Sequence, residues 1–351
     1  MRKLKILLTA CGCPGASTLI RMLKNNGERP IEIIGTDMDN EAVGRFLCDG
    51  FYQVPGGHSE EYIPRMLEIT KKEEPDILFP ESSYEVYPLA QNVEEFEAIG
   101  THVLVSNPEP ISIASDKLGM YETLQKKTAL NLPRYFSVNS LEGFLQAAEK
   151  LGYPESPIVF KPHIGKGSRG VRILDASIQR REHLLQHKPQ NKFMSLAEFE
   201  DIFRGDIDFP ELLVMEFLDG PELTCDSLAF EGRELLTTTK TVEQARWGVI
   251  VKGELVDRPD LVNQTQQILE AIPLSYCVNV QFVADKLIEI NPRVSTFIYQ
   301  RDLIVPYLAV KLALQEITES EVMSYKSRVE YGRRMVRYMD QIFHTGGRRV
   351  Q

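Results

Sequence analysis

The sequence lacks three features that mark particular classes of protein. It has no excess of positive charge, since 40 Lys and Arg stand against 50 Asp and Glu, whereas a sequence-independent nucleic-acid binder is normally basic. It has no apolar run near the roughly 18 residues that span a bilayer. Its five cysteines are an odd, sparse set, which argues against a disulfide framework and suits a reducing cytosol. We therefore expect a cytoplasmic protein with no nucleic-acid or membrane partner.

What the sequence does contain is typical of a folded, multi-unit chain. Its 351 residues are 43% apolar, which excludes a mainly disordered protein and allows two or three packed units. Arg2 to Lys5 followed by an apolar stretch up to Cys11 resembles a short signal sequence. The stretch is shorter than the about 7–15 apolar residues of a signal core, and a glycine turn and a helix follow it, so we expect a buried strand there.

Residues 1–112 alternate between strands and helices. Short apolar runs over 4–10, 31–36, 76–79 and 102–106 predict strands, and helical patterns cover 17–24, 60–72 and 85–97. This alternation predicts a doubly wound, Rossmann-like parallel sheet. Gly12 and Gly15 with Asp37 resemble a dinucleotide fingerprint. The third glycine is replaced by Ser17, so a tight strand-to-helix turn is the favoured interpretation, and a nicotinamide-dependent oxidoreductase stays as an alternative.

The remaining chain predicts a second, mixed region. A helix is expected over 116–130, then a hairpin in which the strands 157–161 and 171–174 flank a glycine-rich loop. Polar residues 176–210 predict one or two surface helices. The segments 212–217, 224–230, 234–240, 278–283 and 286–290 predict strands of one antiparallel sheet. The last 40 or so residues look helical and basic.

Several residues with nucleotide and metal chemistry follow one another in this second region. Lys117 and Lys161 can place charges on phosphates, and backbone amides of a glycine-rich loop can approach phosphate oxygens closely. The strand edge at Glu216, Phe217 and Leu218 can present backbone groups to an adenine, and Glu222 can accept hydrogen bonds from ribose hydroxyls. The loop residues concerned are Gly165, Gly167, Ser168 and Gly170.

A candidate metal site lies near residue 290. Glu289 and Asn291 are two apart on one predicted strand, so they face the same side. Gln281 on the neighbouring strand can converge with them. Oxygen ligands of this kind suit Mg²⁺, which takes few protein ligands together with phosphate oxygens.

This series of motifs resembles the ATP-grasp superfamily, and in particular one synthetase unit of the carbamoyl-phosphate synthase large subunit. The segments Asn279–Val283 and Glu289–Ser295 carry the most specific part of the resemblance. It implies an α/β and α+β protein with a Rossmann-like pre-ATP-grasp domain at 1–112 and an ATP-grasp domain at 113–310. That domain would comprise a phosphate-lid subdomain (113–214) and a metal-binding subdomain (215–310). A helical tail would follow at 311–351.

The resemblance also implies roles for single residues. Lys117 and Lys161 would hold ATP phosphates, Glu216 and Leu218 would frame the adenine, and Glu222 would bind the ribose. Two Mg²⁺ ions, which Mn²⁺ could replace, would be held by Gln281, Glu289 and Asn291, with Glu289 bridging them. Arg293 would stabilise the transferring phosphoryl group and the acyl phosphate.

The implied reaction is ATP-dependent joining of a carboxylate to an amine through an acyl phosphate. The two substrates are expected to be small and amino-acid-like, and the family often forms homodimers. The chain departs from the family pattern at Lys166 and Arg169, between 240 and 260, and in having one synthetase unit without a glutaminase. A carboxylase or a carbamoyl-phosphate-type synthetase that uses bicarbonate is therefore an alternative, as is a nucleotide-binding protein without catalysis, which the presence of Glu289 and Asn291 argues against.

Two further segments are candidates for the acceptor site. The loop after the third strand carries Glu81 and Glu85, and open α/β sheets bind ligands at the carboxyl ends of their strands. Either carboxylate could hold an ammonium group, although Ser82 and Ser83 could instead only cap the next helix. The other segment contains Arg246 and the single tryptophan, Trp247. It would act either as a substrate lid or as a packing anchor.

Overall fold

The computed structural model describes residues 2–165, 169–186, 192–205, 208–246, 248–345 and 348–349. The chain forms two compact units. Unit 1 contains Met1–Ala114, Glu222–Phe282 and Glu289–Gln351, and unit 2 contains Ser115–Pro221 and Val283–Ile288. Each unit combines segments that are separate in the sequence. The domain boundaries at residues 112 and 310 therefore stay a prediction.

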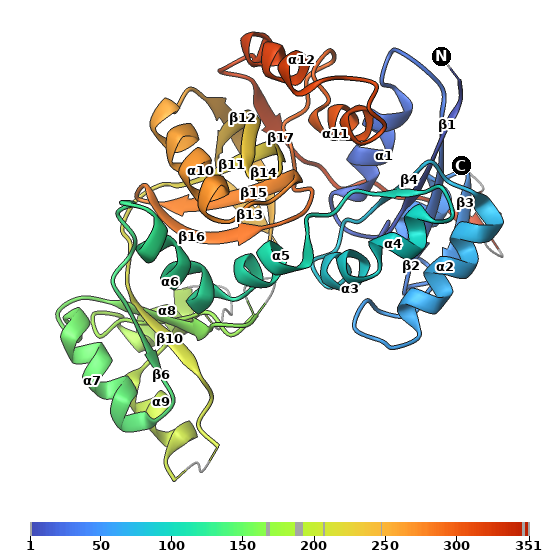
Figure 1. The fold of residues 1–351 in the computed structure, drawn as a ribbon. Helices are drawn as coiled ribbons and strands as arrows, with labels where there is room; N and C mark the ends of the chain where they lie inside the picture. The colour runs from blue at the N-terminus through green and yellow to red at the C-terminus, as the bar shows by residue number, and fades with distance from the viewer. Residues whose placement is uncertain are drawn as a thin grey trace. The chain divides into compact units, whose positions relative to one another are not determined.

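Unit 1 begins with a five-stranded, fully parallel sheet in the order β3-β2-β1-β4-β5 (Figure 1). The parallel sheet predicted from the sequence is confirmed. The helix expected over 85–97 is two helices that meet at Asn92. The strands are β1 (Leu4–Leu8), β2 (Ile31–Asp37), β3 (Gly50–Gln53), β4 (Ile77–Phe79) and β5 (His102–Val103); the helices are α1 (Ala16–Lys24), η1 (Val43–Phe46), α2 (Tyr62–Glu73), α3 (Val86–Gln91), α4 (Val93–Glu97) and α5 (Pro108–Ser115).

The second sheet of unit 1 has seven strands, with the order β13-β14-β12-β11-β15-β16 and β17 paired to β14. Leu228 and Leu236 of this sheet and Leu8 of the parallel sheet join one hydrophobic core, together with α1 and α11. The strands are β11 (Glu222–Phe230), β12 (Arg233–Thr241), β13 (Gln244–Arg246), β14 (Val249–Val256), β15 (Tyr276–Val283), β16 (Lys286–Asn291) and β17 (Arg334–Val336); the helices are α10 (Pro259–Ala271), α11 (Val305–Ala313), α12 (Glu319–Ser324) and η2 (Tyr325–Arg328).

The C-terminal segment is not helical throughout, contrary to the sequence-based expectation for 311–351. After η2, Gly332 has a positive φ of 81° and turns the chain. Leu255 of β14 then bonds through its backbone to Gly332 and to Arg333, and β17 pairs with the stretch Lys252–Glu254. Backbone pairing to β14 therefore outweighs the local preference for helix. A short pair of strands, β18 (His344–Thr345) and β19 (Arg348–Arg349), follows.

Unit 2 contains a five-stranded sheet in the order β6-β10-β7-β8-β9. The predicted hairpin is confirmed, because β7 and β8 pair antiparallel. Phe144, Phe160 and Phe199 pack against one another on this sheet. The strands are β6 (Tyr135–Val138), β7 (Ile158–Pro162), β8 (Arg172–Leu174), β9 (Phe193–Met194) and β10 (Leu212–Glu216); the helices are α6 (Lys117–Lys127), α7 (Leu141–Leu151), α8 (Arg180–Gln186) and α9 (Leu196–Phe203).

One strand was assigned to the wrong sheet. The sequence predicts that 212–217 joins the same antiparallel sheet as 224–230, but β10 pairs with β6 and β7 of unit 2. Gly220 and Pro221 interrupt the extended chain between β10 and β11. A side chain at Gly220 would lie 2.7 Å from the Ala284 Cβ. The close approach at glycine lets the chain leave one sheet and enter the next.

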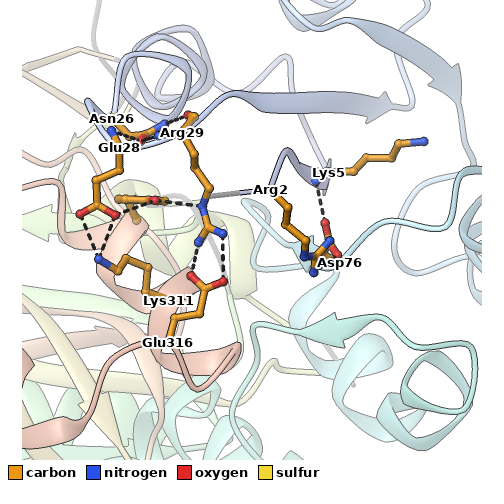
Figure 2. Close-up of polar contacts among 9 residues, drawn as sticks. Arg2, Lys5, Asn26, Glu28, Arg29, Asp76, Lys311 and Glu316 are labelled. Atoms are coloured by element: carbon orange, nitrogen blue, oxygen red, sulfur yellow. Dashed lines mark hydrogen bonds and ion pairs between the residues drawn. The ribbon is translucent and has the colours of Figure 1, made fainter.

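Polar contacts join the segment just before β2 to α11 and to Glu316 beyond its end, within unit 1 (Figure 2). The Arg29 guanidinium is almost fully buried and pairs with Glu316, and its Nε donates to the Tyr307 hydroxyl at 3.1 Å. Beside it, the Lys311 ammonium pairs with both carboxylate oxygens of Glu28 at 2.9 Å. These pairs fix the parallel sheet against a helix that lies about 280 residues later in the chain.

Within the described ranges, no helix combines the length and the apolar character needed to cross a membrane.

Candidate functional site

The candidate metal ligands lie on two neighbouring strands. Gln281 on β15 and Asn291 on β16 are both half-buried, and each donates an amide hydrogen to Asn279 Oδ1, at 3.3 and 3.4 Å. The amide nitrogens are thus used inside the protein, and the carbonyl oxygen of each amide remains for a cation. Glu289 adds a carboxylate on the same side of β16 as Asn291. The donor set consists of oxygen atoms and fits Mg²⁺.

Asn279 is itself held by a network that the sequence analysis missed. Its Nδ2 donates to Thr224 Oγ1 and to Asp226 Oδ1, both at 2.9 Å. The other oxygen of Asp226 pairs with the Lys240 ammonium, and both side chains are fully buried. The available signal was the polar pair Thr224 and Asp226, which are two positions apart in the buried strand β11.

In unit 2, both predicted phosphate-binding lysines are buried near the glycine-rich loop and β16. The Lys117 ammonium donates to the Gly165 carbonyl at 2.8 Å, at the start of that loop. The Lys161 ammonium donates to the Ile288 carbonyl at 3.3 Å. Because Ile288 directly precedes Glu289 in β16, Lys161 lies next to the strand that carries the candidate metal ligands.

The glycine-rich loop is only partly described. Gly170 has φ of 77°, and a side chain there would lie 2.6 Å from Pro162 Cδ, so this end of the loop requires glycine. Gly165 has no such close neighbour. The predicted ligands Gly167 and Ser168 lie outside the described residues.

The candidate adenine-binding segment presents its backbone and not its carboxylate. Glu216 pairs with Lys286 at 2.6 Å and with Arg134 at 3.0 Å. Burial raises the pKa of this carboxyl, but hydrogen bonds from Lys286 and Arg134 outweigh burial and lower it. Phe217 is 37% exposed. Glu216 and Leu218 are therefore candidates for adenine contacts through their backbone groups.

Glu222 belongs to unit 1 and His163 to unit 2. Glu222 opens β11, where it is half-buried and its carbonyl accepts from Val242 N at 2.9 Å. In unit 2, His163 contacts Asp116 at 3.1 Å and Glu211 at 2.7 Å. Burial lowers the His163 pKa, but the two carboxylates raise it by a larger amount, so the net shift of the pKa is upward. His163 thus braces the N-cap of α6, where Lys117 begins.

The loop between β4 and α3 contains two buried carboxyls beside Arg293. Arg293 Nε donates to Ser83 Oγ at 2.7 Å, and Glu85 accepts a hydrogen bond from Thr9. Glu81 Oε2 is buried without a hydrogen-bond partner among the described residues. Burial raises the pKa of Glu81 to about 8, while Arg293 opposes the shift and Glu85 adds to it.

Burial likewise raises the pKa of Glu85 to about 7. The alternative in which Ser82 and Ser83 cap the next helix is wrong, because α3 has no side-chain cap and Ser83 accepts from Arg293.

The glycine turn after β1 is held by Asp37. One Asp37 oxygen accepts from Gly12 N at 2.8 Å and the other from Asp39 N at 2.9 Å. Both oxygens therefore bind backbone N–H groups, as a tight turn requires. This arrangement supports the turn interpretation over a ribose-binding carboxylate.

Arg246 ends β13 and is exposed, opposite Val249 of β14. Trp247 lies outside the described residues.

Comparison with known proteins defines the class. Residues 208–335 match a family model described as ATP-grasp in the biosynthetic pathway with Ter operon, and residues 6–104 match the PylC-like N-terminal domain. The chain thus contains an ATP-grasp domain preceded by a PylC-like N-terminal domain. The family resemblance inferred from the motifs is confirmed.

Among curated relatives, the carbamoyl phosphate synthase large chain of Thermomicrobium roseum is 26% identical over 215 residues, which are 57% of this chain and 18% of that one. The same enzyme of Bifidobacterium adolescentis is 31% identical over 140 residues, covering 40% and 11%. A formate-dependent phosphoribosylglycinamide formyltransferase of Nitratiruptor is 27% identical over 192 residues, covering 54% and 42%. This chain therefore spans less than a fifth of the large chains that it matches.

Solved structures show the same fold. N5-carboxyaminoimidazole synthetase from Staphylococcus aureus, complexed with ADP, aligns with a TM-score of 0.57 and 15% identity, covering 83% of this chain and 70% of that one. The biotin carboxylase domain of Hydrogenobacter thermophilus 2-oxoglutarate carboxylase, a dimer with MgADP and bicarbonate, aligns with a TM-score of 0.58 and 17% identity, covering 90% and 70%. The fold is that of ATP-grasp enzymes.

Proposed function

We propose that the protein is an ATP-dependent ligase that joins a carboxylate to an amine through an acyl phosphate. The observation that carries this proposal is the hydrogen bond from Lys161 to the Ile288 carbonyl. It places a buried ammonium group beside the strand that bears Glu289 and Asn291. Ile288, the residue that Lys161 contacts, directly precedes the candidate metal ligand Glu289 in the chain.

In the first step, a carboxylate oxygen of the acid attacks the γ-phosphorus of ATP, and the bond to the β–γ bridging oxygen breaks as ADP leaves. Phosphoryl transfer depends mainly on positioning and on neutralising charge. Lys117 and Lys161 would hold the phosphates by charge, and Arg293 would stabilise the transferring group. Mg²⁺, held by Gln281, Glu289 and Asn291, would supply further neutralisation of charge.

In the second step, the amine nitrogen attacks the acyl carbon, the bond from carbon to the phosphate oxygen breaks, and phosphate departs with the amine proton. Arg293 suits this step too, because its bonds to Ser83 Oγ and to the Val294 carbonyl hold the guanidinium in place. Charge on a fixed guanidinium needs little reorganisation as the acyl phosphate forms and breaks down.

We propose that the acceptor lies near the Glu81 loop. Arg293 links this loop to the end of the metal-binding strand, and the loop's two carboxyls are buried with raised pKa values. A buried carboxyl of this kind becomes ionised when a cation approaches, so Glu81 or Glu85 suits the ammonium group of an amino-acid-like substrate. We also propose that Arg246 and Trp247 belong to the acceptor side.

Bicarbonate is the alternative acid. Two findings favour it: relatives of this chain are carbamoyl phosphate synthase large chains, and one structure of similar fold is a complex with bicarbonate. Phosphate release that depends on bicarbonate and needs no organic acid would support this alternative. We further propose a homodimer, as described for the Hydrogenobacter domain, which the mass measured in solution would test.

The test of the proposed function has two parts. Amino acids are first screened in pairs for substrate-dependent phosphate release from ATP. Glu289→Gln is then compared with the natural protein on the active pair. The substitution removes one charge from the candidate metal site, and metal neutralisation is worth several kcal/mol, so turnover should fall by about 100-fold or more.

Glu270→Gln is the matched control, because it makes the same change on the exposed face of α10. It should keep full turnover. Near-normal phosphate release from Glu289→Gln would sink the metal assignment.

A further inference from the structure

We propose that Lys240, Asp226 and Asn279 are positioning residues that fix the amide oxygens of Gln281 and Asn291 toward the metal. The inference rests on the proposed metal site. These residues form a buried polar stripe, defined here as Thr224, Asp226, Lys240 and Asn279. It crosses three adjacent strands, β12, β11 and β15, and all of it lies in unit 1.

The stripe lies on one face of the sheet. Thr224 and Asp226 are two apart on β11, and Asn279 and Gln281 are two apart on β15, so each pair faces one side. Thr224 lies opposite Lys240 in the antiparallel register, which puts Asp226 on the diagonal from Lys240. The hydrogen bonds then run in one line, from Lys240 through Asp226 and Asn279 to Gln281 and Asn291.

The hydrogen-bond polarity of this line is fixed at its start. A lysine ammonium can only donate, so the Asp226 carboxylate accepts from it. The amide group of Asn279 must then turn its Nδ2 to Asp226, because an oxygen there would face a carboxylate. Its Oδ1 therefore points to Gln281 and Asn291 and can only accept. These two amides must donate, which leaves their oxygens for the metal.

Without the ion pair between Lys240 and Asp226, no other side chain in this line of hydrogen bonds would fix the orientation of the Asn279, Gln281 and Asn291 amides. The two ends of an amide have nearly the same shape, and only the hydrogen-bond network distinguishes them. Thr224 cannot decide the matter, because its hydroxyl both donates and accepts. An Asn279 amide turned the other way would make Gln281 and Asn291 present NH₂ groups to the cation. Lys240 thus acts on the metal through three hydrogen-bonded side chains without touching it.

The experiment measures Mn²⁺ binding in the presence of ADP by the electron paramagnetic resonance signal of free Mn²⁺. The decisive variant combines Asp226→Asn with Lys240→Met. This pair of changes keeps shape and removes both charges together, which often leaves a fold as stable as before. The polarity is lost, however, so the dissociation constant for Mn²⁺ should rise about 10-fold, a difference of about 1.4 kcal/mol. A merely structural role predicts unchanged Mn²⁺ affinity in a variant of normal thermal stability.

Asn279→Ala is the second variant, and it decides the matter if the double variant fails to fold. It deletes the shared acceptor, so Mn²⁺ affinity should fall at least as far. Ser227→Ala is the matched control: it removes a buried hydroxyl pair with Thr237 on the same two strands, at 2.8 Å, and should leave Mn²⁺ affinity as it is.

Unchanged affinity in the folded double variant, or in Asn279→Ala, overturns the positioning role and leaves the metal site standing. If the natural protein binds no Mn²⁺ with ADP, the metal site itself fails, and the inference fails with it.

Discussion

Two regions of unit 1 bury acidic side chains, and they do so differently. In the seven-stranded sheet, Asp226 is 1% exposed and its oxygens accept from Lys240 and from Asn279. After β4 in the parallel sheet, Glu81 is 6% exposed, yet its Oε2 has no hydrogen-bond partner within the described chain. A buried charge is tolerated when it is paired. An unpaired acid instead holds its proton to a higher pH, as the raised pKa of Glu81 shows.

The difference separates a fixed group from a responsive one. Asp226 is held between the Lys240 ammonium and the Asn279 amide, which suits the orientation of neighbouring amides. Glu81 and Glu85, with pKa values of about 8 and about 7, change protonation near neutral pH. Such groups respond to an arriving cation, as expected of residues at a binding site. Four variants test this contrast.

The largest effect is expected from breaking the fixed pair. Lys240→Met leaves Asp226 buried without its cation, which makes it resemble Glu81. Removing one partner of a buried ion pair costs about 3–5 kcal/mol, so urea denaturation should show a loss of stability in that range. Combining the change with Asp226→Asn should recover most of the loss. A loss below about 1 kcal/mol would mean that the pair is worth no more than an exposed one.

The next effect concerns the responsive acid. The folded-state pKa of Glu81 lies above its ordinary value, so its contribution to stability is complete below about pH 4.5 and is lost as the pH rises through about 8. Glu81→Gln keeps the neutral shape and removes the titration. At pH 8 and above, the variant should therefore be more stable than the natural protein by about 5 kcal/mol, because the pKa rises from 4.5 to about 8 and one pKa unit corresponds to about 1.4 kcal/mol.

Urea denaturation between pH 5 and pH 9 measures this difference. Parallel stability profiles for the two proteins across that range would contradict the raised pKa. Glu270→Gln again serves as a control on an exposed helix face.

A smaller effect is expected at Arg246, whose charge is exposed and therefore belongs to neither class of buried group. Arg246→Ala should raise the KM for the acceptor about 10-fold, or about 1.4 kcal/mol, and leave ATP affinity unchanged. Trp247 supplies an independent signal, since it is the only tryptophan. Its fluorescence should change when the true acid or amine binds, and much less with ATP alone. Full activity in Arg246→Ala and an indifferent signal would favour the packing role.

The smallest effect is expected from an ion pair at the surface. Arg334 pairs with Glu243 and with Glu254 at 2.7 and 2.5 Å, and it is 58% exposed. Exposed pairs contribute about 0–1 kcal/mol, so Arg334→Ala should change stability by less than about 1 kcal/mol. A loss comparable to that of Lys240→Met would show that burial is not what separates the two pairs.

The sequence predicted the parts of the fold that depend on local pattern. The parallel sheet followed from alternating strands and helices, and the β7–β8 hairpin followed from the glycines between two apolar runs. The strand β3 was not predicted, because the segment Gly50–Gln53 is short and only partly buried. The strand β17 was not predicted either. Its pairing with β14 joins residues about 80 apart in the chain, and a local sequence pattern cannot indicate such a distant partner.

The candidate site divides in the same way. The residue types at Lys117, Lys161, Gln281, Glu289 and Asn291 pointed to nucleotide and metal chemistry without a structure. The network of Asp226, Lys240 and Asn279 could not be predicted from the sequence, because these side chains meet only through strand register and strand order. Helix capping by Ser83 likewise stayed open as an alternative, since nothing in the sequence places Arg293 beside it. Side-chain partners from distant strands require the fold.

The pairing of β17 with β14 also affects behaviour in concentrated solution. Met335 and its neighbours occupy backbone N–H and C=O groups of Lys252–Glu254. If that cover were absent, this stretch of β14 would offer unpaired backbone groups to another molecule, and uncovered strands of this kind promote association between chains. We therefore expect the segment from Arg334 to Val336 to lower the tendency to aggregate, although it contributes only three residues to the sheet.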